Sequence, residues 1–405
     1  MQSPGKNWVE VDLASITHNV RMVRKRIGRS VGIIGVVKSE AYGHGASRVA
    51  RLLESLDVEM LAVASVEEGI ALRDRGIKTP ILVLGCIFPE EVGVLLRYSL
   101  IPTLCDNALT QKVSECAGTI GKVAKVHVKI DTGMGGLGVH HSDAVSFITE
   151  VANTENLFIE GLFTHFSSSS EINTGHTHEQ LCIFKDIIRE IESLGIRVPL
   201  KHAANSGAIL RTPGSLFNMV RPGMLLYGLC PSCSDIKHRG HAIGVRPAMA
   251  LKTSLGFIKD VPAGETVSYG RTFKARRPTR VGVLPMGYDN GYIRALSNRS
   301  EVIIHGRRAP VIGRVRMNFV HVDITDVPGA KVGDEVILFG GRGNPSISAE
   351  EVAGLMDTIP YEVVCAAGRS NHRVYINETT RDGYKDDYKE GPVHRPADSV
   401  PVYKG

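Results

Sequence analysis

The sequence predicts an α/β protein with a (β/α)8 TIM-like barrel followed by a mainly β C-terminal domain. From about residue 31, short apolar runs rich in β-branched residues alternate with helical-period segments, which is typical of βα units. After about residue 240 the pattern changes to short alternating strands separated by Pro and Gly turns. A length of 405 residues also favours two domains. We expect a barrel domain at 8–238 and a β domain at 239–376.

Eight apolar runs are the predicted barrel strands. They are IIGVV before Lys38, LAVAS at 61–65, ILVLG at 81–85, IPTLC at 101–105, VHVKI at 126–130, GLFTHF at 161–166, LKHAAN at 200–205 and MVRPGMLLYG at 219–228. The segments between them have helical spacing, most clearly the apolar stripe at 183–194, which Gly195 ends. Eight strands with helical crossovers predict a closed barrel.

The two ends of the chain need separate predictions. The first strand, at 8–13, is assigned to the barrel, with packing against the C-terminal domain as the alternative. The stretch 377–405 has few aliphatic residues and many charges and prolines, which predicts a disordered tail.

Composition excludes several classes of protein. No apolar run approaches the roughly 20 residues of a membrane span, and the basic residues behind the net charge of +6 are scattered, so we expect no membrane or nucleic-acid partner. The cysteines are seven, an odd number, which suits free thiols in a reducing cytosol. The pair Cys230 and Cys233 lacks a second pair or nearby histidines, so we expect no metal. The N-terminus lacks a signal-peptide pattern, which favours a cytoplasmic location.

Polar residues lie at the carboxyl ends of the predicted strands, where barrel enzymes carry their chemistry. They are Lys38, Asp131, His165, Asn205 with Ser206, and Arg221. Lys38 could be a surface lysine whose charged end reaches solvent. The functional alternative is an amine in an apolar setting, which loses its proton more easily and can attack an aldehyde such as pyridoxal phosphate. Groups suited to the phosphate and ring of that cofactor are Tyr42, Ser206, Gly207, Gly223 and Arg221.

Nine motifs between residue 36 and residue 362 form a specific combination. They are VVKSEAYGHG (36–45), KIDTGMGGLG (129–138), GLFTHF (161–166), NSGA (205–208), VRPGMLLYG (220–228), VSYG (267–270), PMGYDNGYIRALSN (285–298), VIGRVRMN (311–318) and IPYE (359–362). By these motifs the chain resembles the alanine racemases, fold-type III enzymes that depend on pyridoxal phosphate. The resemblance extends from about residue 8 to Tyr375.

The resemblance implies an enzyme that interconverts L- and D-alanine and supplies D-alanine for peptidoglycan. It implies pyridoxal phosphate on Lys38 and a homodimer in which Tyr269 of the second subunit is the other base. Two bases on opposite faces of the Cα atom are what inversion of a stereocentre requires, because the proton leaves from one face and returns to the other.

The resemblance also implies roles for other residues. His165 and Arg221 would form a hydrogen-bonded chain with Tyr269. The cofactor-binding set would be Lys38, Tyr42, His165, Asn205, Ser206, Gly207, Arg221, Gly223 and Tyr361. Met317, Tyr288 and Arg316 would meet the substrate, Met317 through its backbone and Tyr288 at the entrance.

The chain departs from the family pattern around the expected substrate site. Gly136 stands where the family has an arginine, so carbamylation of Lys129, which orients that arginine in relatives, is an open question. The usual Cys-Met-Asp is Arg316-Met317-Asn318, and Ser170 replaces an acidic residue. We hypothesise that Arg316 supplies the charge lost at Gly136. Serine or a broader range of amino acids is the alternative to alanine.

Other classes of protein compete with this interpretation. Residues 133–138 read GxGxxG after a strand, with a helix at about 142–152 and Glu160 further on, which would suit a nicotinamide-dependent dehydrogenase. A non-catalytic carrier of pyridoxal phosphate would be a single barrel and would not need the added β domain. The related decarboxylases share both domains, but the chain lacks their GEPGR-like loop.

Overall fold

The computed structural model describes residues 6–171, 175–230, 243–341 and 343–377. The chain divides into two compact units, one formed by Asp12–Ala248 and the other by the residues up to Val11 together with those from Met249 onward. The tail predicted at 377–405 lies outside the described residues except for Asn377, and so does Cys233.

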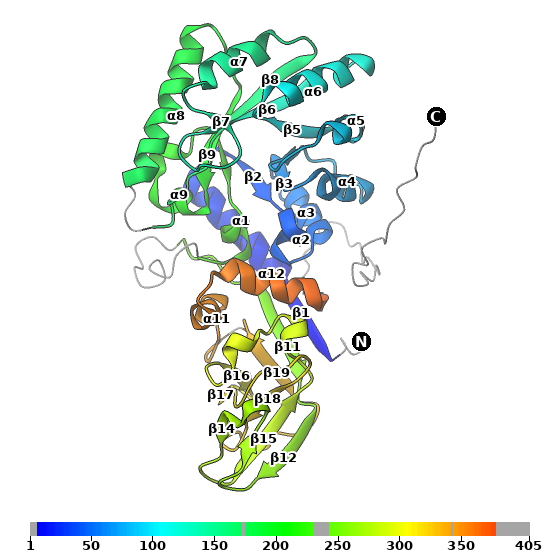
Figure 1. The fold of residues 1–405 in the computed structure, drawn as a ribbon, viewed down its shortest axis with the longest axis vertical. Coiled ribbons are helices and arrows are strands. Elements are labelled where there is room, and N and C mark those ends of the chain that lie inside the picture. The colour runs from blue at the N-terminus through cyan, green and yellow to red at the C-terminus, as the bar shows by residue number, and fades with distance from the viewer. Residues whose placement is uncertain (1–5, 172–174, 231–242, 342, 378–405) are drawn as a thin grey trace. The chain divides into compact units, whose positions relative to one another are not determined.

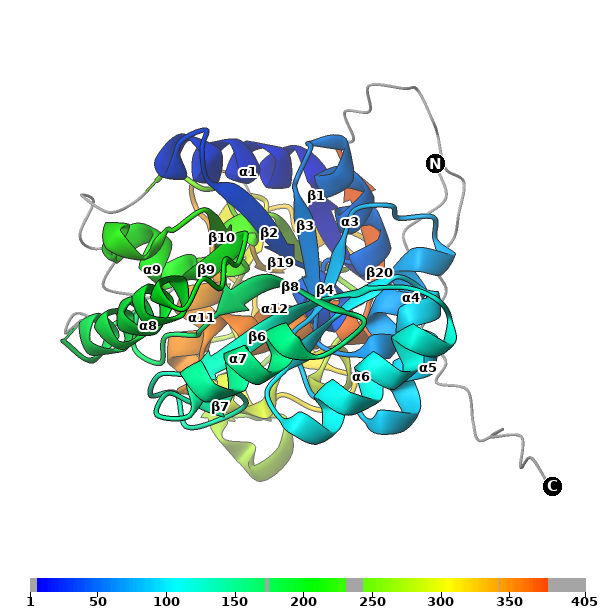
Figure 2. The ribbon, with the colours of Figure 1, turned by 90° about the horizontal axis from the view of Figure 1, so that it is seen from above.

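The first unit is a closed barrel of eight parallel strands (Figure 2). Their bounds are β2 Gly32–Val36, β3 Met60–Val63, β4 Ile81–Val83, β5 Leu100–Leu104, β6 Ala124–Asp131, β8 Leu157–Phe163, β9 Leu200–Asn205 and β10 Met219–Arg221. The strand order is β5-β4-β3-β2-β10-β9-β8-β6, and pairing of β5 with β6 closes the ring. Each of the eight predicted runs overlaps one of these strands, so the predicted barrel is confirmed.

Helices surround the barrel strands (Figure 2). Their bounds are α1 Leu13–Ile27, α3 Ala46–Ser55, α4 Val66–Asp74, α5 Val92–Arg97, α6 Asn107–Thr119, α7 Ala144–Asn153, α8 Gly175–Ser193 and α9 Ser206–Arg211. The apolar stripe predicted at 183–194 lies on α8, where Phe184, Ile187, Ile188 and Ile191 are buried. All residues of β3, β4 and β5 are buried, as expected for parallel strands covered on both faces.

The second unit is mainly β, as the sequence predicts (Figure 1). Its six-stranded sheet has the order β17-β16-β19-β11-β1-β20, and a three-stranded sheet has the order β12-β15-β18. The strand bounds are β1 Asn7–Asp12, β11 Met249–Ser254, β12 Phe257–Val261, β15 Thr279–Leu284, β16 Glu301–Ile304, β17 Arg307–Pro310, β18 Val320–Asp323, β19 Glu335–Phe339 and β20 His372–Ile376. The remaining elements are the short strands β13 Thr266–Val267 and β14 Phe273–Lys274 and the helices α11 Ala349–Met356 and α12 Pro360–Ser370.

The first strand of the chain, β1, pairs antiparallel with β11. Val9 lies opposite Leu251 and Val11 opposite Met249, and both valines are fully buried. The N-terminal strand is therefore a part of the sheet of the second unit.

Among the residues that the structure describes, none of the helices is both long enough and apolar enough to cross a bilayer.

Candidate active site

The segment after β2 turns in the left-handed sense immediately beyond Lys38. Ser39, Glu40, Ala41 and Tyr42 have φ angles of 52°, 55°, 51° and 56°. Consecutive left-handed residues with side chains are strained, at a cost of roughly 1–2 kcal/mol each. Such strain persists only where the surroundings hold it, and it concentrates at functional sites.

Contacts on both sides hold this turn, α2 Lys38–Tyr42. The carboxylate of Glu68, in the first turn of α4, accepts from the amide of Ser39 through Oε1 and from the amide of Ala64 through Oε2, each at 2.7 Å. The ring of Tyr227 packs against that of Tyr42 with centroids 5.1 Å apart, and its hydroxyl donates to the carbonyl of Val36 at 2.8 Å. The turn is therefore fixed by neighbouring strands and helices as well as by its own hydrogen bonds.

Tyr42 lies beside a small polar cradle built by the ends of β9 and β10. The hydroxyl of Ser206 accepts from the amide of Gly223 at 3.0 Å, and a Cβ atom at position 223 would lie 2.6 Å from the hydroxyl of Tyr42. Only glycine allows this approach. Asn205 has a structural task here, because its side-chain oxygen accepts from the amide of Ala208 at 3.0 Å and caps α9, whose second residue is Gly207.

Arg221, the last residue of β10, is buried in the barrel with its guanidinium among neutral acceptors. Nη1 donates to Nδ1 of His202 at 2.6 Å and to the carbonyl of His202 at 2.9 Å. Nη2 donates to the carbonyls of Thr164 at 2.6 Å and Ala203 at 3.1 Å, and to Nδ1 of His165 at 3.3 Å. Burial lowers the pKa of Arg221 to about 9, so it remains a cation at neutral pH.

The contact with Arg221 determines the state of His165. Because arginine has no acceptor, Nδ1 of His165 must accept, and the proton of the neutral ring lies on Nε2. Burial, then the charges of Arg221, Lys129 and Lys38, lower the pKa of His165 to about 3. His165 is thus a neutral donor through Nε2 over the whole physiological pH range.

A series of hydrogen bonds extends from Arg221 into the barrel interior. His202 accepts through Nδ1, so its Nε2 donates to Nδ1 of His127 at 2.9 Å, and Nε2 of His127 faces the carboxylate of Glu160 at 3.6 Å. Both histidines are fully buried, and burial lowers the pKa of each. This series of hydrogen bonds fixes the orientation of the Arg221 guanidinium.

The barrel mouth is positively charged near Lys129. Burial and then the charge of Arg221 lower the pKa of Lys129, and the ring of Phe163 lies 5.8 Å from its Nζ. The carboxylate of Asp131 is partly engaged by the backbone, because its Oδ1 accepts from the amides of Gly133 at 2.9 Å and Met134 at 2.8 Å. It therefore neutralises the charge of Lys129 only in part. A Cβ atom at Gly136 would meet nothing within 4 Å. Position 136 therefore has room for a larger side chain.

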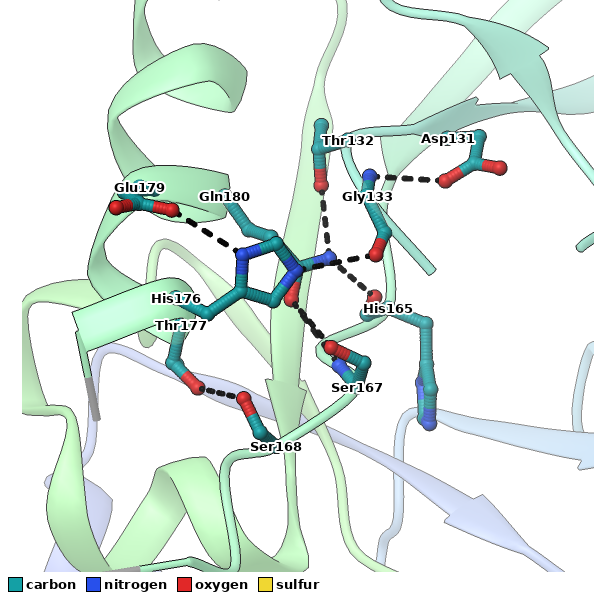
Figure 3. Close-up of polar contacts among 10 residues, drawn as sticks. All are labelled: Asp131, Thr132, Gly133, His165, Ser167, Ser168, His176, Thr177, Glu179 and Gln180. Atoms are coloured by element: carbon teal, nitrogen blue, oxygen red, sulfur yellow. Dashed lines mark hydrogen bonds and ion pairs between the residues drawn. The ribbon is translucent and has the colours of Figure 1, made fainter. Parts of the chain in front are cut away.

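Gln180 of α8 joins the ends of β6 and β8 behind His165 (Figure 3). Its fully buried amide donates to Oγ1 of Thr132 at 3.3 Å and to the carbonyl of His165 at 3.1 Å. Its oxygen accepts from the amide and the hydroxyl of Ser167 at 3.1 and 3.2 Å. All four hydrogen-bonding positions of the amide are used, so Gln180 fixes the backbone that carries His165.

In the β unit, backbone hydrogen bonds place the turn that begins at Tyr288 beside Arg316 and Met317. Tyr269 begins the 3₁₀ turn η4, Tyr269–Arg271, and Tyr288 begins η5, Tyr288–Asn290. The amide of Tyr288 donates to the carbonyl of Arg316 at 3.1 Å, and the amide of Asp289 donates to the carbonyl of Met317 at 3.2 Å. In the isolated chain Tyr269 and Met317 are 64% and 54% exposed.

Arg316 and Tyr361 complete the predicted residues of the β unit. The guanidinium carbon of Arg316 lies 5.0 Å from the ring centroid of Tyr269 and 5.3 Å from that of Phe319. Tyr361 lies in the first turn of α12, where burial raises its pKa to about 12, which keeps it a phenol that can donate.

The predicted residues therefore form two groups. The barrel group comprises Lys38, Tyr42, His165, Asn205, Ser206, Gly207, Arg221 and Gly223, and the β-unit group comprises Tyr269, Tyr288, Arg316, Met317 and Tyr361. Sequence reasoning missed Glu68, His127, His202 and Gln180. Local sequence patterns could have indicated two of these residues. Glu68 has capping-box spacing from Ser65, and Gln180 lies one turn before Phe184 on the apolar face of α8.

The fold and the site define a class of two-domain barrel enzymes. Its features are a parallel barrel with a lysine at the end of the first barrel strand, a buried arginine–histidine pair and an added β domain. Family models agree and give the name: the alanine racemase N-terminal domain matches residues 11–231 and the C-terminal domain matches residues 248–375. The chain belongs to the alanine racemase family, which confirms the resemblance seen in the sequence.

Individual relatives support this assignment over nearly the whole chain. The alanine racemase of Halothermothrix orenii is 41% identical over 92% of this chain and 97% of its own length. Alanine racemase 2 of Caldanaerobacter subterraneus subsp. tengcongensis is 42% identical over 91% of this chain and 94% of its own. The solved structure of the Clostridium difficile 630 alanine racemase superposes with a TM-score of 0.86 at 37% identity, covering 93% of this chain and 96% of that chain.

Proposed function

We propose that this chain racemises alanine with pyridoxal phosphate as its cofactor. The observation that carries the proposal is the arrangement at the barrel mouth, where Lys38 begins a strained turn and the cation of Arg221 holds a neutral His165. Membership of the alanine racemase family supports the same reaction. A dehydrogenase is not supported, since Glu160, the acidic residue of its expected fingerprint, is bound by Lys125 at 2.6 Å.

The barrel residues fit pyridoxal phosphate in charge and shape. Glycine at position 223 lets the hydroxyl of Tyr42 approach the backbone, because a Cβ atom there would lie 2.6 Å from that hydroxyl, and Ser206 adds a second hydroxyl beside it. These groups would hold the phosphate, with Asn205 and Gly207 shaping the loop and Tyr361 contributing a phenol. Arg221 would face the ring nitrogen and keep it unprotonated, because a guanidinium does not give up its proton readily. When bound, the cofactor supplies an electron-withdrawing ring that makes the Cα proton of the amino acid acidic.

Two side chains of the protein would move the proton. Lys38 takes or returns the Cα proton on one face of the substrate, and the partner subunit's Tyr269 does so on the other. His165, with its proton on Nε2, can donate to the phenolate oxygen that this role creates, and Arg221 holds His165 in that tautomer. The exposure of Tyr269 and Met317 in the single chain supports a homodimer that covers them.

Substrate contacts would come from the β unit. Met317 would meet the carboxylate through its backbone, Tyr288 would line the entrance, and Arg316 would supply the cation that Gly136 cannot. Alanine is the favoured substrate by family membership. Serine or a broader range is a second candidate, favoured by the open space at Gly136 and by Asn318 and Ser170 at positions expected near the substrate. The product D-alanine would serve peptidoglycan synthesis in the cytoplasm.

Borohydride reduction followed by peptide mapping tests the cofactor assignment. We expect a phosphopyridoxyl group on Lys38, and an adduct on another lysine would contradict the proposal. Racemisation assays across amino acids test the substrate. Activity on lysine or arginine without activity on alanine would exclude the favoured substrate.

A further inference from the structure

We infer that Glu68 is a positioning residue that holds Lys38 in its place at the barrel mouth. The inference rests on the proposed role of Lys38 and adds a residue that touches neither substrate nor cofactor. It starts from two hydrogen bonds, one on each side of Lys38, that connect this segment to the strand β3 and the residues that follow it. The amide of Val37 donates to the carbonyl of Ala62 in β3 at 2.9 Å, and the amide of Ser39 donates to Glu68 at 2.7 Å.

Glu68 links the turn to the end of β3 through one carboxylate. Its second oxygen accepts from the amide of Ala64, directly after β3, at 2.7 Å. A charged acceptor bound to two backbone amides forms strong hydrogen bonds and fixes both groups in direction. The residues before and after Lys38 are thereby tied to neighbouring points on one strand.

The internal hydrogen bonds of the turn cannot replace this link. The amide of Ala41 donates to the carbonyl of Val37 at 2.9 Å, and that of Gly43 donates to the carbonyl of Ser39 at 3.1 Å. These bonds close the left-handed turn on itself, but they do not orient it against β3. The amide of Ser39 lies in the first turn, where backbone N–H groups have no partner within the helix, so it depends on a side chain.

Glutamine at position 68 breaks one anchor with little change in shape. Its amide has one oxygen and one NH2 group, and the NH2 group cannot accept from a backbone N–H. Glu68→Gln therefore leaves the amide of Ser39 or that of Ala64 unpaired. Glu67→Gln is the matched control, because Glu67 is the adjacent residue in the same helical turn and its carboxylate accepts from the side chain of Ser65, whereas the amide of Ser39 donates to Glu68.

The experiment compares wild type, Glu68→Gln and Glu67→Gln as full chains, first freed of cofactor and then with pyridoxal phosphate added. In the cofactor-free proteins we measure hydrogen exchange in the peptide covering 36–45 and the rate of reductive methylation of Lys38 by formaldehyde with cyanoborohydride as the reductant, with Lys78 as the internal reference. With cofactor we measure the rate at which visible absorbance develops. We expect Glu68→Gln to exchange at least tenfold faster in that peptide, to change the Lys38 methylation rate at least threefold, and to capture the cofactor about tenfold more slowly.

Equal methylation of Lys38 in the two variants would overturn the inference, even if hydrogen exchange differs, because the contact would then be structural only. If Glu68→Gln does not fold, Glu68→Asp, which keeps the carboxylate, replaces it with the same criteria. Failure of the proposed function gives a different result. In that case wild type itself takes up no pyridoxal phosphate on Lys38, while the methylation comparison still decides the role of Glu68.

Discussion

The guanidinium of Arg316 lies over the ring of Tyr269, 5.0 Å from its centroid, so the residue that departs from the family pattern contacts the proposed second base. A cation against an aromatic face stabilises both groups by about 0.5–2 kcal/mol, depending on how far water is excluded. We expect this contact to orient the ring of Tyr269, and the proposed contact with the substrate carboxylate would use the same cation.

Removal of Arg316 should weaken substrate binding more than turnover. We expect Arg316→Ala to raise the KM for alanine about tenfold or more, the effect of losing a charged hydrogen bond worth about 1.5–3 kcal/mol, with a smaller change in kcat. Steady-state kinetics in both directions measure this. Arg299→Ala, which removes an exposed arginine elsewhere in the β unit, is the control, and an unchanged KM in Arg316→Ala would exclude compensation for Gly136.

An arginine at position 136 should be tolerated and should restore the lost charge. A Cβ atom there meets nothing within 4 Å, so Gly136→Arg is expected to fold with a melting temperature close to that of wild type. In the Arg316→Ala background it should lower the KM again. A double variant with the same KM as Arg316→Ala would show that the two positions do not serve the same group.

Loss of the Tyr269 hydroxyl should stop inversion and leave exchange on one face. We expect Tyr269→Phe to reduce kcat by about 100-fold to 10,000-fold, the usual contribution of a positioned acid or base. In deuterated water, one enantiomer of alanine should still exchange its Cα proton without inversion, because Lys38 remains. NMR of the recovered alanine measures this, with Tyr98→Phe as the control. Exchange lost equally for both enantiomers would argue against separate bases.

The buried histidines should make the barrel lose stability as the pH falls below about 6.5. The folded-state pKa values of His127, His165 and His202 are lowered, that of His165 to about 3, so below about pH 6.5 the unfolded chain binds protons that the folded chain does not. Stability therefore rises with pH through this window, by up to about 1.4 kcal/mol per pH unit for each histidine. Chemical denaturation at pH 5, 6 and 7 measures the slope. Replacing His202 by Asn should reduce it, whereas replacing the exposed His178 by Gln should not.

Substitution of Gln180 should destabilise the barrel and disturb His165. Gln180→Leu leaves the amide of Ser167 and other buried groups unpaired, at a cost of about 1–3 kcal/mol for each. We expect a loss of roughly 3 kcal/mol in the free energy of unfolding, measured by urea denaturation. The control is Gln111→Leu at an exposed position of α6, and equal effects of the two substitutions would contradict the assigned contacts.

Strand positions and strand ends were readable from the sequence because each depends on a local pattern. Alternation of apolar runs and helical segments located all eight barrel strands, and the same pattern placed Lys38 and Arg221 at strand ends. The family motifs added the β-unit residues, whose roles remain predictions.

Contacts between distant segments were not readable in the same way. Glu68 has the spacing of a capping box, which predicts a bond to the backbone of Ser65, yet its carboxylate binds Ala64 and Ser39 instead. The pairing of His127 with His202 depends on two strands that are not adjacent along the chain. The left-handed turn also has no local signature, since Ser39, Glu40 and Ala41 adopt it under tertiary restraint.

The pairing of β1 with β11 has a consequence for biosynthesis. Val11 can pair only after Met249 has been synthesised, so the ribosome completes the entire barrel sequence before β1 can pair with β11. At about 5–20 residues per second this interval is on the order of tens of seconds. During it Trp8, Val9 and Val11, which are buried in the finished fold, belong to an unpaired apolar strand that a chaperone could bind. The barrel is topologically an insertion in the β domain, and a C-terminal fragment made without residues 7–12 would lack the strand between β11 and β20.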